Sequence, residues 1–464
     1  MSIPRERTDI KVSQERAVLV AVHLPSSRFD ERDPLGELRA LAETAGASVV
    51  GELVQRKQRP ESGTYLGTGK LEELKLMCDE LKAGIVVFDN DLTPSQMGNI
   101  EKVIERKVVD RSELILDIFA GRATTREAKL QVELAQLEYT YPRLRAMWDH
   151  LERIVGVGGI GGIGTRGPGE QQLEIDRRLV QRRVVMLKRE LAEVQARKAR
   201  EVRDRNIDHL TIGIVGYTNA GKSTLFNTLT SGGAFANDQL FATLITRTRG
   251  WPLDRGVSVM LSDTVGFVRD LPHNLVASFR ATLEEATHAH LLLIVLDVSD
   301  PSAELQYETV QSTLEDLFEQ TAELERKEGI TWQRPEQIVL LNKADKLRDN
   351  SLLLYWQSRV PGAIPFSAAQ SGEDALGHDI LRRRVLAMAR GPMQELNLTL
   401  PLADSRSVSQ IEQRAEVLDR TYDDGHVTIR ARIGERQLAQ LRAGGARIHA
   451  EPANADPSAT RAQA

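Results

Sequence analysis

At 464 residues the chain is long enough for about three domains, each with a hydrophobic core of its own. Hydrophobic residues make up 41% and charged residues 27%, as in a soluble globular protein, and the net charge of −5 does not by itself indicate nucleic-acid binding. The single cysteine, Cys78, excludes an intramolecular disulfide and fits a reducing cytosol. The start has no apolar signal core, and the longest apolar run, 291–296, is far short of the ~20 residues that span a bilayer. We therefore expect a soluble, cytoplasmic protein without a transmembrane segment.

After an N-terminal extension, 1–15, the segment 16–124 alternates short apolar strands with amphipathic helices. Strands are predicted at 17–22, 48–54 and 85–88, and helices at 35–45, 70–81, 94–104 and 112–119. Alternation of this kind predicts a small α/β domain with a parallel sheet.

The segment GTYLGTGK, 63–70, is similar to a phosphate-binding loop. Its glycine spacing is one residue too long, and Leu71 stands where such a loop has a Mg²⁺-binding Ser or Thr. A turn before a helix is therefore the favoured interpretation, and a second site for ATP or another nucleotide is the alternative.

The segment 125–206 changes to long helices. Apolar residues recur with a 4-3 heptad spacing at 130, 134, 137, 141, 144, 148, 151 and 155, and again at 180, 184, 187, 191 and 194. Two such runs joined by a loop predict an antiparallel helical hairpin. Pro142 is expected to kink or split the first helix.

Between the two runs lies a tip loop, 156–169, in which 8 of 14 residues are glycine. A structural turn needs only one or two glycines, so this loop is expected to mould onto a partner. The segment 126–205 carries 17 Lys or Arg and 12 Asp or Glu, a net charge of +5 on an otherwise acidic chain. With Arg166 in the loop, this charge favours contact with an RNA backbone; the alternative is an ordinary solvated helix face.

The segment 207–391 contains GYTNAGKS, 216–223, between an apolar strand at 210–215 and a helix that begins near Thr224. Strand, glycine-rich turn and helix are the context that a G-x-x-x-x-G-K-[ST] phosphate-binding loop requires. Backbone N–H groups at the helix start can bind an anion, Lys222 can reach the β- and γ-phosphates, and the Ser223 hydroxyl can bind Mg²⁺.

A second motif, DTVG, 263–266, follows an apolar strand at 257–261. Asp263 can hold Mg²⁺ through water, and the Gly266 N–H can contact the γ-phosphate. The next residue is Phe267, where Ras-like enzymes have a glutamine that orients the attacking water. Hydrolysis is therefore expected to be slow unless a partner, or another polar residue of the chain, supplies that group.

The base is specified by NKAD, 342–345, which follows a strand at 338–341. The Asp345 carboxylate can accept two hydrogen bonds from guanine, whereas adenine offers neither donor and would leave the charge unpaired. Ser367, Ala368 and Ala369 follow another strand and can donate backbone N–H groups to the base oxygen. Together these motifs predict guanine-nucleotide binding.

The first switch is assigned to FATL, in which the Thr243 hydroxyl would meet Mg²⁺ and its N–H the γ-phosphate; Thr246 and Thr248 are nearby alternatives. The residues expected to act in catalysis are Lys222, Thr243 and Gly266, and those expected to hold Mg²⁺ are Ser223 and Thr243. The residues expected to bind the nucleotide are Gly216, Tyr217, Thr218, Asn219, Ala220, Gly221, Lys222, Ser223, Thr224, Phe241, Ala242, Thr243, Asp263, Thr264, Val265, Gly266, Asn342, Lys343, Asp345, Ser367, Ala368 and Ala369.

The segment 392–450 reads strand, helix, strand, strand, helix, strand, with Asp424-Gly425 at the central hairpin. That order predicts a small ferredoxin-like α+β domain. The tail, 451–464, is Ala-, Pro- and polar-rich and is expected to be disordered. The predicted architecture is thus α/β: a P-loop GTPase domain, preceded by a small α/β domain with a long helical hairpin and followed by this domain.

With these motifs placed, the chain resembles the HflX family of translation-factor-related GTPases over roughly residues 17–450. The resemblance rests on TYLGTGKLEEL (64–74), on the run 114–144 ending in YTYPRL, on RGPGEQQLEIDRR (166–178) and on DTVGFVRDLP (263–272). The first switch differs from the family's usual FATLDPT in having Ile245-Thr246, and the glycine loop is a few residues longer.

The resemblance implies Mg²⁺-dependent GTP hydrolysis, binding to the large ribosomal subunit, and splitting or rescue of stalled or stress-inactivated ribosomes. It also implies that the glycine-rich loop reaches ribosomal RNA, and that phenylalanine after DTVG is a family feature. A monomer with no DNA partner is expected, and peripheral membrane association stays open. Two alternatives are an RNA-binding or RNA-remodelling regulator with the GTPase domain as a timer, and a signalling switch for a protease or membrane partner.

Overall fold

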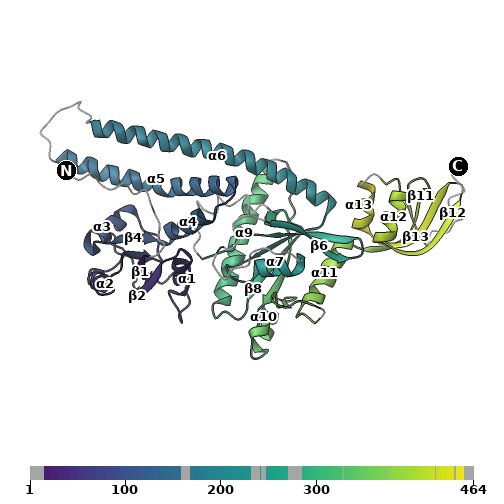
Figure 1. Cartoon of the computed structure of the whole chain (residues 1–464), viewed down its shortest axis with the longest axis horizontal. Helices are drawn as coiled ribbons and strands as arrows, with labels where there is room; N and C mark the ends of the chain where they lie inside the picture. The colour runs from purple at the N-terminus through teal and green to yellow at the C-terminus, as the bar shows by residue number, and fades with distance from the viewer. Residues whose placement is uncertain are drawn as a thin grey trace.

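The computed structural model describes residues 15–157, 168–230, 241, 247–269, 285–327, 329–372, 374–423, 425–443 and 446–453 (Figure 1). An N-terminal sheet with a helical hairpin lies at one end, a six-stranded sheet lies in the middle, and a small antiparallel sheet lies at the other end (Figure 1). This arrangement confirms the predicted fold class. Ala242, Thr243, Arg166 and most of the glycine-rich tip loop lie outside the described residues.

The N-terminal domain is a parallel sheet with helices on both faces. Its strands, in the order β2-β1-β3-β4, are β1 (Arg16–His23), β2 (Ser48–Arg56), β3 (Ile85–Phe88) and β4 (Lys107–Asp110), and its helices are α1 (Gly36–Thr44), α2 (Thr68–Glu80), α3 (Pro94–Ile104) and α4 (Arg111–Arg122). Alternate residues of β1 point to opposite faces, so Leu19 packs with α1 and α4 whereas Val20 packs with α2 and α3. Because helices bury both faces of the sheet, strands such as β1 and β3 consist largely of apolar residues.

The sequence did not predict β4, which is only four residues long. Val108 and Val109 are its two apolar residues, too few to produce a recognisable alternation. The strand is followed at once by α4, whose first turn is capped by the Asp110 carboxylate accepting from the Glu113 N–H at 2.9 Å. The sheet edge and the start of α4 are thereby fixed to each other.

The hairpin consists of α5 (Arg126–Val157) and α6 (Pro168–Asp208), which lie side by side (Figure 1). Leu130, Leu134, Leu187 and Leu191 form its apolar seam, as the heptad spacing predicts. Salt bridges Arg183–Glu133 and Lys188–Glu138, both 2.7 Å, flank that seam. Pro142 does not split α5, since a proline removes one intrahelical hydrogen bond and the rest of this long helix continues past it.

The central sheet has the order β10-β9-β8-β5-β7-β6 and is parallel except for β6. Its strands are β5 (Thr211–Gly216), β6 (Arg247–Asp254), β7 (Val257–Asp263), β8 (Leu291–Asp297), β9 (Glu336–Asn342) and β10 (Ile364–Pro365). Its described helices are α7 (Lys222–Thr230), α9 (Ala303–Lys327), η1 (Ala344–Lys346), α10 (Ser351–Arg359) and α11 (His378–Arg390). Two apolar clusters cover the two faces of the sheet. Because β5, β7 and β9 run parallel, their carboxyl ends lie on the same side of the sheet.

The C-terminal domain comprises β11 (Met393–Pro401), α12 (Ser405–Arg414), β12 (Glu416–Asp423), β13 (His426–Gly434), α13 (Glu435–Ala443) and β14 (His449–Pro452). Its antiparallel sheet has the order β12-β13-β11-β14, as the predicted split β-α-β pattern requires. Within the described part of the chain, no helix is both long and apolar enough to cross a membrane.

Candidate functional site

The phosphate-binding loop joins the fully buried strand β5 to α7, and its backbone admits only glycine at two positions. Gly216 has φ +152°, and a Cβ built there would lie 2.3 Å from the Val295 carbonyl oxygen. Gly221 has φ +97°, and a Cβ there would lie 2.3 Å from Asn342 Nδ2. The motif's glycines are therefore needed for close approach of β8 and β9 to the loop.

Lys222 is the first residue of α7 and is only 6% exposed. Its Nζ donates to the Tyr217 carbonyl at 2.6 Å, inside the curve of the loop. Burial lowers the pKa of Lys222 to about 8, although nearby Asp263 acts in the opposite direction. A buried ammonium whose charge is disfavoured by its surroundings gains from an incoming anion, which is the property a phosphate site needs.

Ser223 and Asp263 lie together at the start of α7 and the end of β7. The Ser223 hydroxyl donates to Asp263 Oδ2 at 2.9 Å, and Asp263 is 1% exposed. A hydroxyl oxygen and a carboxylate oxygen beside a phosphate loop are hard ligands of the kind Mg²⁺ prefers. This pair could hold the ion of a Mg²⁺–nucleotide complex.

The segment after Asp263 turns back onto the phosphate loop. The Phe267 N–H donates to the Gly216 carbonyl at 3.0 Å, and the Thr218 N–H donates to the Phe267 carbonyl at 2.8 Å. A Cβ built on Gly266 would lie 2.9 Å from Lys222 Nζ, so this glycine touches the lysine. The Phe267 ring is buried in the apolar cluster around β8 and offers no polar group to a water molecule.

The guanine motif is held to the phosphate loop by Asn342, which is 1% exposed. Its Nδ2 donates to the Ala220 carbonyl at 2.7 Å, and its Oδ1 accepts from the Ala368 N–H at 2.9 Å. Asp345 is exposed, and its carboxylate makes no hydrogen bond to the residues that the structure describes. Asn342 therefore fixes the positions of the phosphate loop, the NKAD motif and the segment 367–369 relative to one another. Asp345 faces solvent.

Sequence reasoning missed two residues that complete this arrangement. Asp297, at the end of β8, forms a 2.6 Å salt bridge with Lys343, whose Nζ also donates to the Asn219 carbonyl. Thr228 of α7 donates to the Ala368 carbonyl at 2.8 Å. Asp297 could have been found from its place after the apolar run 291–296, whereas Thr228 carries no sequence signal.

The predicted residue Phe241 is in contact with the N-terminal domain. Its ring meets the Phe119 ring edge-on with centroids 4.5 Å apart, and its carbonyl accepts from Arg122 Nη1 at 2.8 Å. Of the first-switch residues predicted from FATL, Ala242 and Thr243 fall outside the described residues.

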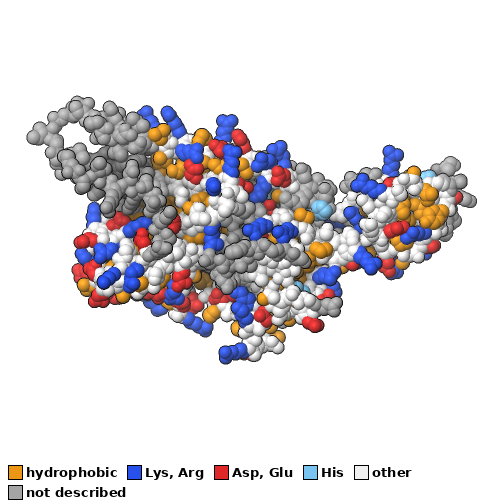
Figure 2. Space-filling model, viewed as in Figure 1, with side chains coloured by type: hydrophobic (Ala, Val, Ile, Leu, Met, Phe, Trp, Pro, Cys, Tyr) orange, Lys and Arg blue, Asp and Glu red, His pale blue; other side chains and the backbone are white. Residues whose placement is uncertain are grey.

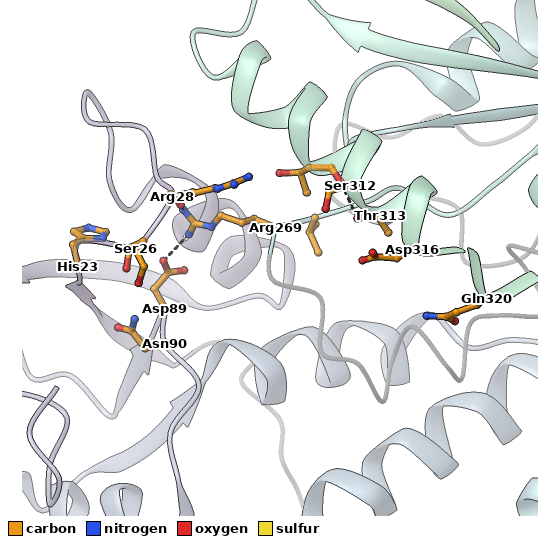
Figure 3. Close-up of a pocket in the computed structure, with 13 residues that line it drawn as sticks. His23, Ser26, Arg28, Asp89, Asn90, Arg269, Ser312, Thr313, Asp316 and Gln320 are labelled. Atoms are coloured by element: carbon orange, nitrogen blue, oxygen red, sulfur yellow. Dashed lines mark hydrogen bonds and ion pairs between the residues drawn. The ribbon is translucent and has the colours of Figure 1, made fainter. Parts of the chain in front are cut away.

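A separate cavity of about 550 Å³ lies between the carboxyl ends of β1 and β3 and helix α9 (Figure 3). His23, Arg28, Asp89, Arg269 and Asp316 are among its lining residues, and no residue of the phosphate loop or NKAD motif lines it. It is therefore distinct from the predicted nucleotide site. The GTYLGTGK segment, in turn, forms a structural turn, in which Gly67 caps α2 and donates to Gln55 Oε1 at 2.9 Å while Leu71 is buried in the core.

Three family models match consecutive parts of the chain. They are described as "GTP-binding GTPase N-terminal" over residues 32–120, "GTP-binding GTPase Middle Region" over 122–205, and "50S ribosome-binding GTPase" over 211–343. The GTPase HflX of Caldanaerobacter subterraneus is 38% identical over 421 residues, which cover 90% of this chain and 91% of that protein. The chain belongs to the HflX family of GTPases.

Other HflX proteins are also similar to this chain. That of Lacrimispora saccharolytica is 48% identical over 318 residues, covering 67% of this chain and 73% of that protein. A crystal structure of a GTP-binding protein from the archaeon Sulfolobus solfataricus in complex with GDP is 26% identical, with a TM-score of 0.40 over 81% of this chain and 99% of that one. As an HflX protein with a P-loop GTPase domain, this chain is a GTP hydrolase.

Proposed function

We propose that this HflX protein binds Mg²⁺–GTP at the site formed by the phosphate loop, DTVG and NKAD, and that it binds the large ribosomal subunit to split or rescue stalled ribosomes. The arrangement of Lys222, Ser223, Asp263 and Gly266 at the end of β5 and β7 supports the nucleotide half of this proposal. The observation that carries the ribosomal half is the match of residues 211–343 to a family model described as a 50S ribosome-binding GTPase.

In this proposal, guanine is recognised by the exposed Asp345 carboxylate, which accepts from the N1–H and 2-amino groups. The Ala368 and Ala369 N–H groups, which are predicted to donate to the base oxygen, lie on the segment that Asn342 holds. The Ala368 N–H already donates to Asn342 Oδ1. Discrimination against adenine follows because Asp345 would lose both donors.

The side-chain oxygen atoms of Ser223 and Asp263 are ligands that suit a Mg²⁺ ion, and Thr243 is the further ligand expected from the sequence. The ion would supply charge neutralisation between the β- and γ-phosphates. Lys222 would bind the same phosphates directly, and the Gly266 N–H would donate to the γ-phosphate. Phe267 leaves no side chain to orient water, so basal turnover is slow and a ribosomal partner supplies the missing group.

The described part of the hairpin supports an RNA partner. Arg189 and Arg197 of α6 have 84% and 69% of their side-chain surface exposed, and within the described residues the ion pair of each is a long i,i+4 contact with a glutamate. Figure 2 shows Lys and Arg side chains along the outer side of the hairpin. Such side chains are available for phosphate contacts, and Arg166 in the tip loop would add another.

The test is GTP turnover by the full chain with and without purified large ribosomal subunits, with ATP as the control nucleotide. Stimulation of GTP turnover by one to several orders of magnitude, and none with ATP, is expected. Fast hydrolysis by the protein alone would show that the chain supplies its own water-orienting group. No stimulation, together with tight binding of isolated RNA, would favour the RNA-binding regulator.

A further inference from the structure

Thr218 of the phosphate loop has a buried hydroxyl group without a partner. The residue is 6% exposed, and its Oγ1 makes no hydrogen bond to the residues that the structure describes. Its backbone is nevertheless fixed, because the Thr218 N–H donates to the Phe267 carbonyl at 2.8 Å. A buried hydroxyl that lacks a partner costs free energy on folding, which points to a partner that arrives with the ligand.

The other hydroxyl groups of the phosphate loop and the DTVG motif already have partners. The Thr264 hydroxyl donates to a carbonyl of β5 at 2.6 Å, and the Ser223 hydroxyl donates to Asp263 at 2.9 Å. The Tyr217 hydroxyl donates to a carboxylate of α1. Within these two motifs, both of which the structure describes, the Thr218 hydroxyl is therefore the one that stays available to a ligand.

The Thr218 side chain lies where Lys222 and Gly266 meet. A Cβ built on Gly266 would lie 2.8 Å from Thr218 Cγ2, and 2.9 Å both from Thr218 Cα and from Lys222 Nζ. In a GTP complex the γ-phosphate is bound by this lysine and by the Gly266 N–H. Because Oγ1 and Cγ2 of Thr218 are carried by the same carbon atom, we expect the hydroxyl to lie within hydrogen-bond reach of the γ-phosphate.

A threonine hydroxyl can make the hydrogen bonds that a glutamine side chain makes to the attacking water in Ras-like enzymes. The glutamine amide has an oxygen that accepts from water and an N–H that donates. A hydroxyl has one donor and two acceptor positions, so it can accept from the water and donate to a γ-phosphate oxygen. Phe267, which stands in place of the glutamine, has its ring buried in the apolar cluster around β8 and can do neither.

We infer that Thr218 is a catalytic residue that orients the attacking water in the free protein. The water oxygen bonds to the γ-phosphorus while the bond from phosphorus to the β–γ bridging oxygen breaks, and that oxygen keeps the electron pair as part of GDP. The proton that the water loses goes to the released phosphate. Because a single oxygen atom makes both hydrogen bonds, the water is held less rigidly than by an amide, and the turnover of the free protein stays slow. This role rests on GTP binding at the phosphate loop, as proposed above, and a group supplied by the ribosome would act in addition to it.

The test compares GTP hydrolysis by the full-length wild type and Thr218→Val without ribosomes. Valine keeps the branched shape and the methyl contact with Gly266, and it removes only the hydroxyl. We expect kcat to fall about tenfold or more, while KM for GTP and the dissociation constant of GDP stay within about twofold. A wild-type kcat, or a GDP affinity that falls as much as kcat, would overturn the inference. A wild type that does not bind GDP would contradict the nucleotide site itself, and this role with it.

Two variants serve as controls. Thr218→Ser retains the hydroxyl and should keep most of the wild-type turnover. Thr321→Val removes a hydroxyl from a residue of α9 that is also 6% exposed, where it donates to the Leu317 carbonyl at 2.8 Å, and it should leave kcat unchanged. Equal losses of turnover in Thr218→Val and Thr321→Val would contradict a role specific to Thr218.

Two further measurements distinguish a catalytic role of Thr218 from a structural one. Because its hydroxyl makes no hydrogen bond within the described chain, Thr218→Val should not lower the midpoint of thermal unfolding. GDP with aluminium fluoride imitates the transferring γ-phosphoryl group, and Thr218→Val should bind this complex about tenfold more weakly than the wild type does. A lowered midpoint that accompanies the loss of turnover, or equal binding of the complex by both proteins, would contradict the catalytic role.

Discussion

In the proposed function, base selectivity depends on Asp345, whose exposed carboxylate follows Asn342 in the NKAD motif. Asp345→Asn replaces an acceptor of two hydrogen bonds by an amide that can donate to a carbonyl oxygen. We expect GTP affinity to fall by about 100-fold, and affinity for xanthosine triphosphate, which has a carbonyl in place of the 2-amino group, to rise.

The measurement is competition of GTP and xanthosine triphosphate for the protein. Asp379→Asn, on the exposed surface of α11 where it pairs with Arg383, is the matched control and should not change either affinity. Retention of full GTP preference by Asp345→Asn would place the base elsewhere.

Lys222 is predicted to make nucleotide affinity depend on pH. Its lowered pKa of about 8 means that the free protein loses this charge as the pH rises through 8, whereas bound phosphate requires the charge. We expect GDP affinity to fall about fourfold between pH 7.0 and 8.5. Titration of the protein with GDP at several pH values across this range tests the prediction. The Lys222→Arg variant, whose side chain stays charged, should show an affinity that does not change with pH. A wild-type affinity that does not change with pH would contradict the assigned pKa.

The same lysine has a consequence for stability. Its folded-state pKa is below the unfolded value, so the unfolded chain binds more protons between about pH 8 and 10.5. This group therefore opposes folding fully below pH 8, and its unfavourable contribution diminishes as the pH rises through that window.

At this scale the structure brings together most of the residues that the motifs single out. The glycines of the phosphate loop, Lys222, Asp263 and Asn342 belong to short patterns whose chemistry is local, and their role in nucleotide binding stays a prediction. Tyr217 and Arg269 also lie in or beside these patterns, but their partners Glu37 and Asp89 are 180 residues distant in sequence. No local pattern encodes such a pairing, so their contacts came only from the structure.

At the scale of elements, periodicity predicted long and strongly patterned segments. Helices α5 and α6 and the order of the C-terminal domain follow from heptad spacing and from strand alternation. The strand β4 was not predicted, because a strand of four residues is too short to show a recognisable alternation of apolar and polar residues. Pro142 was overestimated as a helix breaker, because a long helix can tolerate one missing hydrogen bond.

The hairpin seam allows a direct test of the helical pairing. Leu187 is fully buried among Leu130, Leu134 and Leu191, so Leu187→Ala should lower the free energy of unfolding of the hairpin by about 2–5 kcal/mol. Val185→Ala, two residues away and 68% exposed, should change it by no more than ~0.5 kcal/mol.

Local hydrogen exchange in α5 and α6 is the measurement, with basal GTP turnover as a check that the phosphate site is intact. Equal effects of the two substitutions would mean that α6 does not pack on α5 through this seam.

At the scale of the molecule, residues of the GTPase domain pack into the N-terminal domain. Phe241 packs on Phe119, Val268 lies in the N-terminal core, and Arg269 forms a 2.6 Å salt bridge with Asp89. The fold of each domain could be predicted from its own segment of sequence. Their mutual arrangement could not, since it depends on residues that belong to one domain by sequence and to the core of another by packing.

Helix α6 has a mechanical consequence. It is 41 residues long, about 60 Å at the rise of an α-helix, and it ends at Asp208, so that only residues 209 and 210 separate it from β5, which begins at Thr211. Because this joint is short, a tilt of about 10° of the helix relative to β5 would displace its far end by roughly 10 Å. The length of α6 would therefore turn a small change of angle beside the phosphate loop into a large displacement at the other end of the hairpin.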